Sequence, residues 1–290
     1  MKNSEKIPVA SFPPQSQDVQ PGIQSEMAPQ PDTEPRTYER GQKLHGKVAI
    51  ITGGDSGIGK AAALLFADEG ADLVIVYYNE HEDAQETERE LSARGSSVLL
   101  LSGDLSEEEF CRQVVEETIA KFGKIDILVN NAAVQFPQES LEKITAEQLE
   151  VTFRINVFAP FFLTRAALPY MEAGSSIINS SSITAFRGSE RLIDYAATKG
   201  ALISFTRSLS TALIKKGIRV NAVAPGPIWT PLIPASFDPE EVARFGKDVP
   251  MGRAGQPHEA ATAYLFLASD DSSYFTGQTL HPNGGVVVNT

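Results

Sequence analysis

Short apolar runs of strand length alternate with longer helix-forming segments from residue 47 onward. The runs are KVAIITGG (47–54), ADLVIVYY (71–78), SVLLLSGD (97–104), KIDILVNN (124–131), SSIINSS (175–181), IRVNAVAP (218–225) and TLHPNGG (279–285). The segments predicted to be helical are 58–69, 80–94, 106–122, 145–171, 193–216 and 257–268. Apolar strands separated by helices are typical of a parallel sheet covered on both faces. We therefore expect one doubly wound α/β domain with a mostly parallel, seven-stranded sheet.

Two of the predicted helices begin with a capping pattern. Ser106-x-x-Glu109 and Thr145-x-x-Gln148 each place an acid or amide three residues after a hydroxyl side chain. In this pattern both side chains accept hydrogen bonds from free N–H groups of the first turn. The pattern predicts helix starts at Ser106 and Thr145.

The N-terminal part of the chain differs from the rest in composition. Residues 1–45 hold seven of the 18 prolines and six glutamines, without a strand or helix period. Such a segment cannot bury enough apolar surface to form its own core. It is either a disordered tail or an extended arm on the domain or on a neighbouring subunit, anchored by Phe12, Met27 and Tyr38. We therefore divide the chain into an extended arm, 1–45, and one domain, 46–290.

Charge and composition argue against several classes of protein. The net charge is −12, and a nucleic-acid binder needs a basic face, so nucleic acid is not an expected partner. Cys111 is the one cysteine, so an intrachain disulfide is impossible. The four histidines are scattered without metal-ligand spacing, so no metal is expected. No apolar stretch has the length of a signal sequence or a membrane span, and we expect a cytoplasmic protein with no membrane partner.

The first apolar run ends in TGGDSGIG (52–59), directly before a predicted helix. Glycines at 53, 57 and 59 permit a tight turn, a close approach of the backbone to a pyrophosphate, and close packing of helix on strand. The free N–H groups and the positive dipole end of the helix then face the phosphates. A tight turn with no ligand is the alternative. The order of strand, turn and helix is the one that a Rossmann-type dinucleotide site requires.

Tyr195 and Lys199 lie four residues apart near the start of the predicted helix 193–216. Because this spacing is about one helical turn, both side chains lie on one face of the helix. An ordinary surface pair is the alternative. A free phenol has a pKa near ~10, and a neighbouring ammonium group lowers it. The pair could therefore be a general acid/base with a cation that adjusts its pKa.

Five features resemble the short-chain dehydrogenase/reductase family in order and spacing. They are the glycine turn Thr52–Gly59, NNAA at 130–133, Ser182, Tyr195-x-x-x-Lys199 and Pro225-Gly226. The resemblance covers about residues 46–285, essentially the whole domain. The Pro/Gln-rich extension and the EHEDA that follows the second run are similar to a bacterial subgroup of general-stress and glucose-dehydrogenase-like oxidoreductases.

The resemblance implies an NAD(P)-dependent oxidoreductase that transfers a hydride between nicotinamide and a small alcohol or carbonyl substrate, such as an aldehyde, ketone or sugar. It implies a homotetramer in which helices 145–171 and 193–216 pair across subunit interfaces. No metal is needed, because a tyrosine and a serine polarise the substrate. A catalytically silent NAD(P)-binding sensor or scaffold protein is the alternative, and the retained tyrosine, lysine and serine favour the enzyme.

The resemblance also implies the catalytic residues. Tyr195 would be the acid/base, and Lys199 would lower its pKa and bind the nicotinamide ribose. Ser182 would polarise the substrate oxygen; its two preceding serines are chemically equivalent, and the family spacing selects Ser182. Asn156 would help to hold a water that reaches Lys199, with a local hydrogen bond as the alternative role.

Contacts with the cofactor are implied at the ends of several strands. The residues are Gly53, Asp55, Ser56, Gly57, Ile58, Gly59, Tyr78, Asn79, Asp104, Leu105, Asn131, Ala132, Tyr195, Lys199, Pro225, Gly226, Ile228 and Thr230. The second run ends without the acid that holds an adenosine ribose, and without a cation for a 2′-phosphate. Acidic residues nearby, Asp55, Glu80 and Glu82, favour NAD over NADP.

A proline-rich stretch, 227–250, is predicted to form a lid over the substrate. Trp229 either lines the pocket or packs inside the lid. Gln135, Phe136 and Arg187 are expected at the pocket edge, where Arg187 either binds an anionic group or stays solvated. The shape of this lid decides the substrate, and the sequence leaves that shape open.

Overall fold

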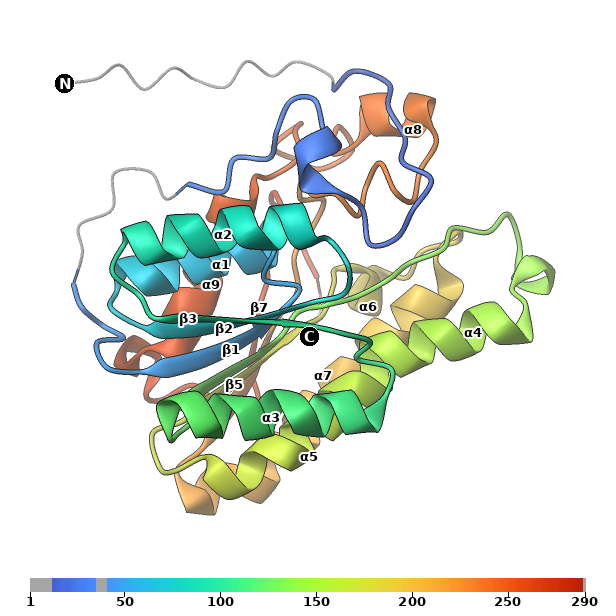
Figure 1. Cartoon of the computed structure of the whole chain (residues 1–290). Coiled ribbons are helices and arrows are strands. Elements are labelled where there is room, and N and C mark those ends of the chain that lie inside the picture. Colours follow the sequence, from blue (N-terminus) through green and yellow to red (C-terminus); the bar gives the residue numbers. More distant parts are fainter. Residues whose placement is uncertain (1–11, 35–40, 289–290) are drawn as a thin grey trace.

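The computed structural model of the chain describes residues 12–34 and 41–288. These residues form one sheet with helices on both faces (Figure 1). The strands are β1 (Val48–Thr52), β2 (Asp72–Tyr77), β3 (Val98–Ser102), β4 (Ile127–Asn130), β5 (Ser176–Ser180), β6 (Arg219–Val223) and β7 (Thr279–Leu280). Every neighbouring pair is parallel, in the order β3-β2-β1-β4-β5-β6-β7. The prediction of a doubly wound, seven-stranded parallel sheet is confirmed.

Helices cover the sheet in two layers (Figure 1). The α-helices are α1 (Gly57–Asp68), α2 (His81–Ala93), α3 (Glu108–Phe122), α4 (Ala146–Phe153), α5 (Ala159–Ala167), α6 (Thr184–Arg187), α7 (Ile193–Leu213), α8 (Pro239–Arg244) and α9 (Pro257–Ala268). Side chains of α1, α2 and α9 form one apolar core against the sheet, and those of α3, α5 and α7 form the other. Neighbouring residues of β1 point to opposite faces, so Ile51 enters the first core and Ile50 the second.

The strand order reverses beside β1. This strand pairs with β2 on one side and with β4 on the other, and the chain passes to the opposite face of the sheet between them. In open α/β sheets a crevice forms at such a point, outside the carboxyl ends of the strands. The fold therefore places the ends of β1 and β4 at the mouth of a cleft.

One of the two predicted helix starts is confirmed and the other is wrong. Thr145 Oγ1 accepts from the Gln148 N–H at 3.1 Å and caps α4. The helix α3 begins at Glu108 instead, and its N-cap, Glu107, makes no side-chain hydrogen bond. The Ser106 N–H donates to Asp104 Oδ1 at 2.8 Å, so the preceding loop holds this residue in a turn.

The predicted helix 145–171 is continuous but not uniform. Between α4 and α5 lies a π-helical turn, Arg154–Phe158, and a 3-10 turn, Leu168–Tyr170, follows α5. The stretch Ala146–Tyr170 is long and apolar enough to cross a membrane by length and composition alone. It packs instead on the domain, with α4 against α7 and α5 against α3.

The described part of the N-terminal segment lies on the domain of its own chain, beside α8 (Figure 1). Phe12 stacks on Trp229 with ring centroids 3.8 Å apart, and the Trp229 indole donates to the Pro29 carbonyl at 3.0 Å. Met27 is buried in the same apolar cluster. Phe12 and Met27 therefore act as the expected anchors, whereas Tyr38 lies outside the described residues. The division of the chain at residue 45 stays a prediction.

Candidate active site

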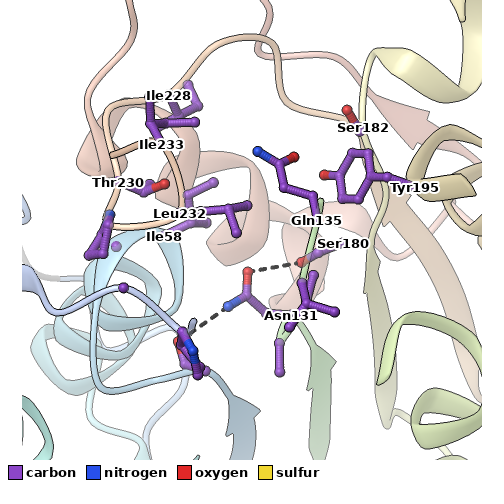
Figure 2. Close-up of a pocket in the computed structure, with 18 of the residues that line it drawn as sticks. Ile58, Asn131, Gln135, Ser180, Ser182, Tyr195, Ile228, Thr230, Leu232 and Ile233 are labelled. Atoms are coloured by element: carbon purple, nitrogen blue, oxygen red, sulfur yellow. Dashed lines mark hydrogen bonds between the residues drawn. The ribbon is translucent and has the colours of Figure 1, made fainter. Parts of the chain in front are cut away.

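A cavity of about 890 Å³ opens at the carboxyl ends of the central strands (Figure 2). Its walls come from the glycine turn after β1, the segments after β4 and β5, helix α7, the 227–250 lid and the N-terminal arm. Figure 2 shows Ser182 and Tyr195 on one side and the lid residues Ile228, Thr230 and Ile233 on the other. The site therefore lies where the strand order reverses.

The glycine turn leaves room for the phosphates of a ligand to contact its backbone. A Cβ on Gly59 would lie 1.9 Å from the Gly53 carbonyl oxygen, so only glycine fits there. Gly53 and Gly57 have positive φ values of 62° and 52°, which other residues rarely adopt. The first helical hydrogen bond of α1 runs from the Lys60 N–H to Ser56, which leaves the earlier N–H groups without helical partners. These residues fit a dinucleotide pyrophosphate.

Asn131 joins the turn to the neighbouring strands. Its Nδ2 donates to the carbonyls of Thr52 and Gly53 at 3.0 and 3.2 Å, and its Oδ1 accepts from Ser180 Oγ at 3.2 Å (Figure 2). Ser180 Oγ also lies 2.7 Å from the Tyr264 hydroxyl. Asn131 therefore positions the turn and lines the cavity at the same time.

Helix α7 presents Tyr195 and Lys199 to the same cavity that Ser182 lines. All three are buried, and Lys199 Nζ lies 5.5 Å from the centre of the Tyr195 ring. Lys199 Nζ donates to the Ser180 carbonyl at 2.7 Å, which ties α7 to the end of β5. The predicted trio is brought together, and the pair is no ordinary surface pair.

Burial shifts the pKa values of both members of the pair. Burial raises the pKa of Tyr195 to about 12, and a hydrogen bond with Ser182 acts in the opposite direction. Burial also lowers the pKa of Lys199 to about 7. Lys199 is not among the causes of the Tyr195 shift. The expectation that Lys199 lowers the tyrosine pKa concerns the site with a nicotinamide ring bound, and it stays a prediction.

Asn156 lies in the π-helical turn, fully buried and outside the cavity wall. Its side-chain amide exchanges two hydrogen bonds with the backbone of Val134, both at 2.9 Å, and also donates to Thr198 Oγ1 at 3.2 Å. The extra residue of a π-turn is a known way to aim a side chain at a functional site. Here it aims Asn156 at the segment after β4, which lines the cavity. Its role toward Lys199 stays a prediction.

Most of the predicted cofactor contacts line the cavity. They are Gly53, Asp55, Ser56, Gly57, Ile58, Tyr78, Asp104, Leu105, Asn131, Ala132, Tyr195, Lys199, Pro225, Gly226, Ile228 and Thr230. Gly59 and Asn79 do not line it. Gly59 packs against the turn itself, and Asn79 is exposed beyond the end of β2.

The pocket edge contains Gln135, Phe136 and Arg187, as expected. Trp229 does not line the cavity; it is fully buried inside the lid, against Phe12 and Met27. The second alternative for Trp229 is therefore correct.

Sequence reasoning did not predict that the arm reaches the cavity. Gln20, Pro21 and Gly22 line its wall, and Gln20 Nε2 donates to the Gln135 carbonyl at 2.5 Å. A Cβ on Gly22 would lie 2.3 Å from the Pro231 carbonyl oxygen, so the arm touches the lid closely at this point. The one signal in the sequence was Gly22, a glycine directly after a proline in a proline-rich segment, which is too common to indicate a site.

A group of buried carboxylates lies beside the glycine turn. Asp55, Glu80 and Asp83 are all buried. Burial and the nearby Glu80 raise the pKa of Asp55 to about 7, and burial raises the pKa of Glu80 as well. The Asp83 carboxylate instead accepts backbone hydrogen bonds from Gln24 and Ser25 of the arm, the first at 2.6 Å.

The raised pKa of Asp55 predicts a pH-dependent effect of Asp55→Asn on stability. Its pKa is 3.8 in the unfolded chain and about 7 in the fold. The group's stabilising contribution is thus complete below pH 3.8 and lost as pH rises through about 7. An amide has no such titration. We expect the variant to melt several degrees above the parent at about pH 8, with the difference vanishing toward about pH 4, in thermal unfolding. A variant that is equally destabilised at both pH values contradicts this interpretation.

Known proteins resemble this chain over nearly its whole length. The family model described as "Enoyl-(Acyl carrier protein) reductase" matches residues 53–287. General stress protein 39 of Bacillus subtilis is 57% identical over 279 residues, 96% of this chain and 98% of that protein. Glucose and ribitol dehydrogenase of Daucus carota is 52% identical over 284 residues, 96% and 98% of the two chains. NADPH-dependent aldehyde reductase 1, chloroplastic, of Arabidopsis thaliana is 52% identical over 282 residues, 95% and 98%.

Solved structures of related proteins have the same fold. A short-chain dehydrogenase from Burkholderia cenocepacia in complex with NADP superposes with a TM-score of 0.79 at 32% identity, covering 84% of this chain and 98% of that one. The 3-ketoacyl-(acyl-carrier-protein) reductase of Brucella melitensis, complexed with NADH, gives 0.76 at 34% identity, with 83% and 98% covered. The sheet order, the glycine turn and these likenesses agree, and the chain belongs to the short-chain dehydrogenase/reductase family of NAD(P)-dependent oxidoreductases.

Proposed function

We propose that this oxidoreductase transfers a hydride between a nicotinamide dinucleotide and a small alcohol or carbonyl substrate, with Tyr195 as the acid/base. One observation supports this most strongly: Tyr195, Ser182 and Lys199 line the same cavity as the glycine turn. A catalytically silent sensor or scaffold protein would need only the glycine turn, because it binds the dinucleotide without acting on a substrate. The buried lysine beside a buried tyrosine is costly for stability, and such perturbed groups cluster at functional sites.

Each residue of the trio has a separate task. A nicotinamide dinucleotide held by the glycine turn would supply or take up the hydride. Ser182 Oγ donates a hydrogen bond to the substrate oxygen, and Tyr195 passes the proton to it during reduction. Lys199 is anchored through one N–H to the Ser180 carbonyl, which leaves two donors of its ammonium group for ribose hydroxyls.

Small aldehydes, ketones and sugars are the proposed substrates. The relatives named glucose and ribitol dehydrogenase and NADPH-dependent aldehyde reductase support this class. The cavity is also lined by charged groups at its outer edge: Arg187, Glu190, Arg191, Glu241 and Asp248. Such groups can hydrogen-bond to substrate hydroxyls.

The cytoplasmic location stays a prediction.

For the cofactor we retain the proposal of NAD over NADP. Asp55 and Glu80 line the cavity, and the segment Tyr78–Glu80 after β2 contains no arginine or lysine that could hold a 2′-phosphate. One relative, of Arabidopsis thaliana, is named as an NADPH-dependent aldehyde reductase, which weighs against this preference. Titration with both dinucleotides separates the two possibilities.

Replacing Tyr195 with Phe removes the hydroxyl and keeps the ring. Because general acid/base catalysis contributes roughly 10²–10⁴-fold, we expect kcat to fall by about that factor. Absorbance at 340 nm, with sugars, small alcohols and aldehydes as substrates and each dinucleotide in turn, measures the rate.

Tyr170→Phe is the matched control, because Tyr170 is an exposed tyrosine away from the cavity. Cofactor affinity should survive in both variants. Unchanged turnover in Tyr195→Phe would refute the mechanism, and tight dinucleotide binding by the parent without turnover of any substrate would favour the sensor.

The high pKa of Tyr195 predicts opposite pH profiles for the two directions. At about pH 7 the phenol keeps its proton, since burial raises its pKa to about 12. The phenol can donate to a carbonyl oxygen, whereas alcohol oxidation needs the phenolate. We expect initial rates of oxidation at low substrate to rise steeply between about pH 7 and pH 10, while reduction stays level or falls. An oxidation rate that is flat over this range shows that another group accepts the proton.

A homotetramer is the proposed assembly. On α4, α5 and the turn between them, Leu149, Val151, Phe158 and Phe161 are exposed, between 42% and 47%. Phe161 stacks on Phe205 of α7 at 3.9 Å, which makes one apolar surface from both helices. A surface of this kind on a soluble domain indicates a contact with another protein.

We expect Phe161→Glu to dissociate the assembly into smaller species, because it places a charge in the apolar contact. Sedimentation velocity measures the mass. Tyr274→Glu is the control, since Tyr274 is fully exposed and lies elsewhere. A monomeric parent protein at micromolar concentration contradicts the proposal.

A further inference from the structure

The side chain of Gln135 brings an amide to the cavity wall. This residue follows β4, lines the cavity and is only 4% exposed. Its hydrogen bonds are made by its backbone, and within residues 12–34 and 41–288 no group bonds to its side-chain amide. Neither amide atom is sealed inside the protein, so both are open to the cavity. The amide is therefore free to bind a ligand there.

The backbone that carries this side chain is fixed on both sides. Gln20 of the arm donates through Nε2 to the Gln135 carbonyl at 2.5 Å, and its Oε1 accepts from the Gln135 N–H at 3.3 Å. Asn156 exchanges the same two kinds of hydrogen bond with Val134, both at 2.9 Å. Since all four polar backbone groups of these two successive residues are engaged, the direction of the Gln135 side chain is set before a ligand arrives.

The amide points to the part of the cavity next to the catalytic residues. Figure 2 shows Ser182 and Tyr195 on one side of the amide end of Gln135. The lid residues Ile228 and Ile233 lie on the other side and are apolar. In the proposed function Ser182 and Tyr195 hold the reacting oxygen. The Gln135 amide is then placed for the neighbouring part of the substrate.

The chemistry of an amide selects a particular class of group. It offers two donors and one acceptor without a charge. A hydroxyl group also donates and accepts, so one hydroxyl can use both ends of the amide. An alkyl chain in the same place would cover the amide and leave it unpaired, and leaving a buried polar group unpaired is costly. A site built in this way discriminates against analogues that lack the hydroxyl.

We propose that Gln135 is a specificity-determining residue that hydrogen-bonds to a substrate hydroxyl on the carbon next to the reacting one. The enzyme then prefers hydroxyaldehydes, polyols and sugars to plain aldehydes and alcohols of the same size. This inference rests on the proposed function and narrows its substrate class.

Two pairs of substrates that differ in that single hydroxyl test the role. They are 2-hydroxypropanal with propanal, for reduction, and D-glucose with 2-deoxy-D-glucose, for oxidation. Gln135→Met keeps the length of the side chain and removes its donors and acceptor. We expect the ratio of kcat/KM between the hydroxylated and the deoxy member to fall roughly threefold to tenfold, as for the loss of a neutral hydrogen bond. Nicotinamide absorbance at saturating dinucleotide measures both rates.

The ratio separates specificity from a structural role, because damage to the fold or to the chemistry lowers both rates of a pair together. Gln113→Met is the matched control: it makes the same change at an exposed glutamine of α3 outside the cavity and should keep the parent's ratio. If Gln135→Met shows no cooperative thermal unfolding, Gln135→Leu decides by the same criterion.

The outcomes are distinct. A fall of about threefold or more in the ratio, for a pair that the parent turns over, supports the inference. A smaller fall, a rise, or equal losses on both members overturn it, and so does a parent that turns over neither pair. The proposed function survives each of these results if Tyr195→Phe abolishes turnover of some other alcohol or carbonyl compound. A parent that turns over no such compound overturns both.

Discussion

Hydrogen bonds between the carboxyl ends of β1, β4 and β5 hold the whole site in register. Asn131, after β4, donates to the last carbonyls of the β1 turn and accepts from Ser180 of β5. Lys199 of α7 then donates to the Ser180 carbonyl. A shift of one strand end would break bonds at the other two. The phosphate-binding turn and the helix with Tyr195 therefore keep a fixed distance, although 130 or more residues separate them in the chain.

This arrangement buries several ionisable groups in the wall of the cavity. Burial moves the pKa of Tyr195 to about 12, of Lys199 to about 7 and of Asp55 to about 7. Each shift disfavours the charged form of its group. A ligand that brings hydroxyls or charge can restore the charged forms. The activation of Tyr195 by Lys199 and a bound dinucleotide stays a prediction.

Local patterns predicted those parts of the structure that depend on neighbours in the sequence. The apolar runs gave the strands, and Thr145 caps α4 as its pattern indicates. The predicted helix start at Ser106 was wrong because Asp104, two residues earlier, holds the Ser106 N–H in a turn. The π-helical turn at Asn156 was not predictable, since it depends on a backbone partner, Val134, in another segment. The position of Gln20 in the cavity wall was not predictable for the same reason, because its hydrogen-bond partner, Gln135, is 115 residues away.

Docking of the arm must offset a large loss of conformational entropy, of order 1–2 kcal/mol for each ordered residue. Five prolines between residues 12 and 34 reduce that loss, because they restrict the free arm before it docks. The apolar contacts of Phe12 and Met27 with Trp229 supply the remaining stabilisation at one end. The contacts around Gln24 are polar, and polar exchange with water yields little net stability. The apolar end of the arm at Trp229 therefore contributes more to docking than the polar middle part around Gln24.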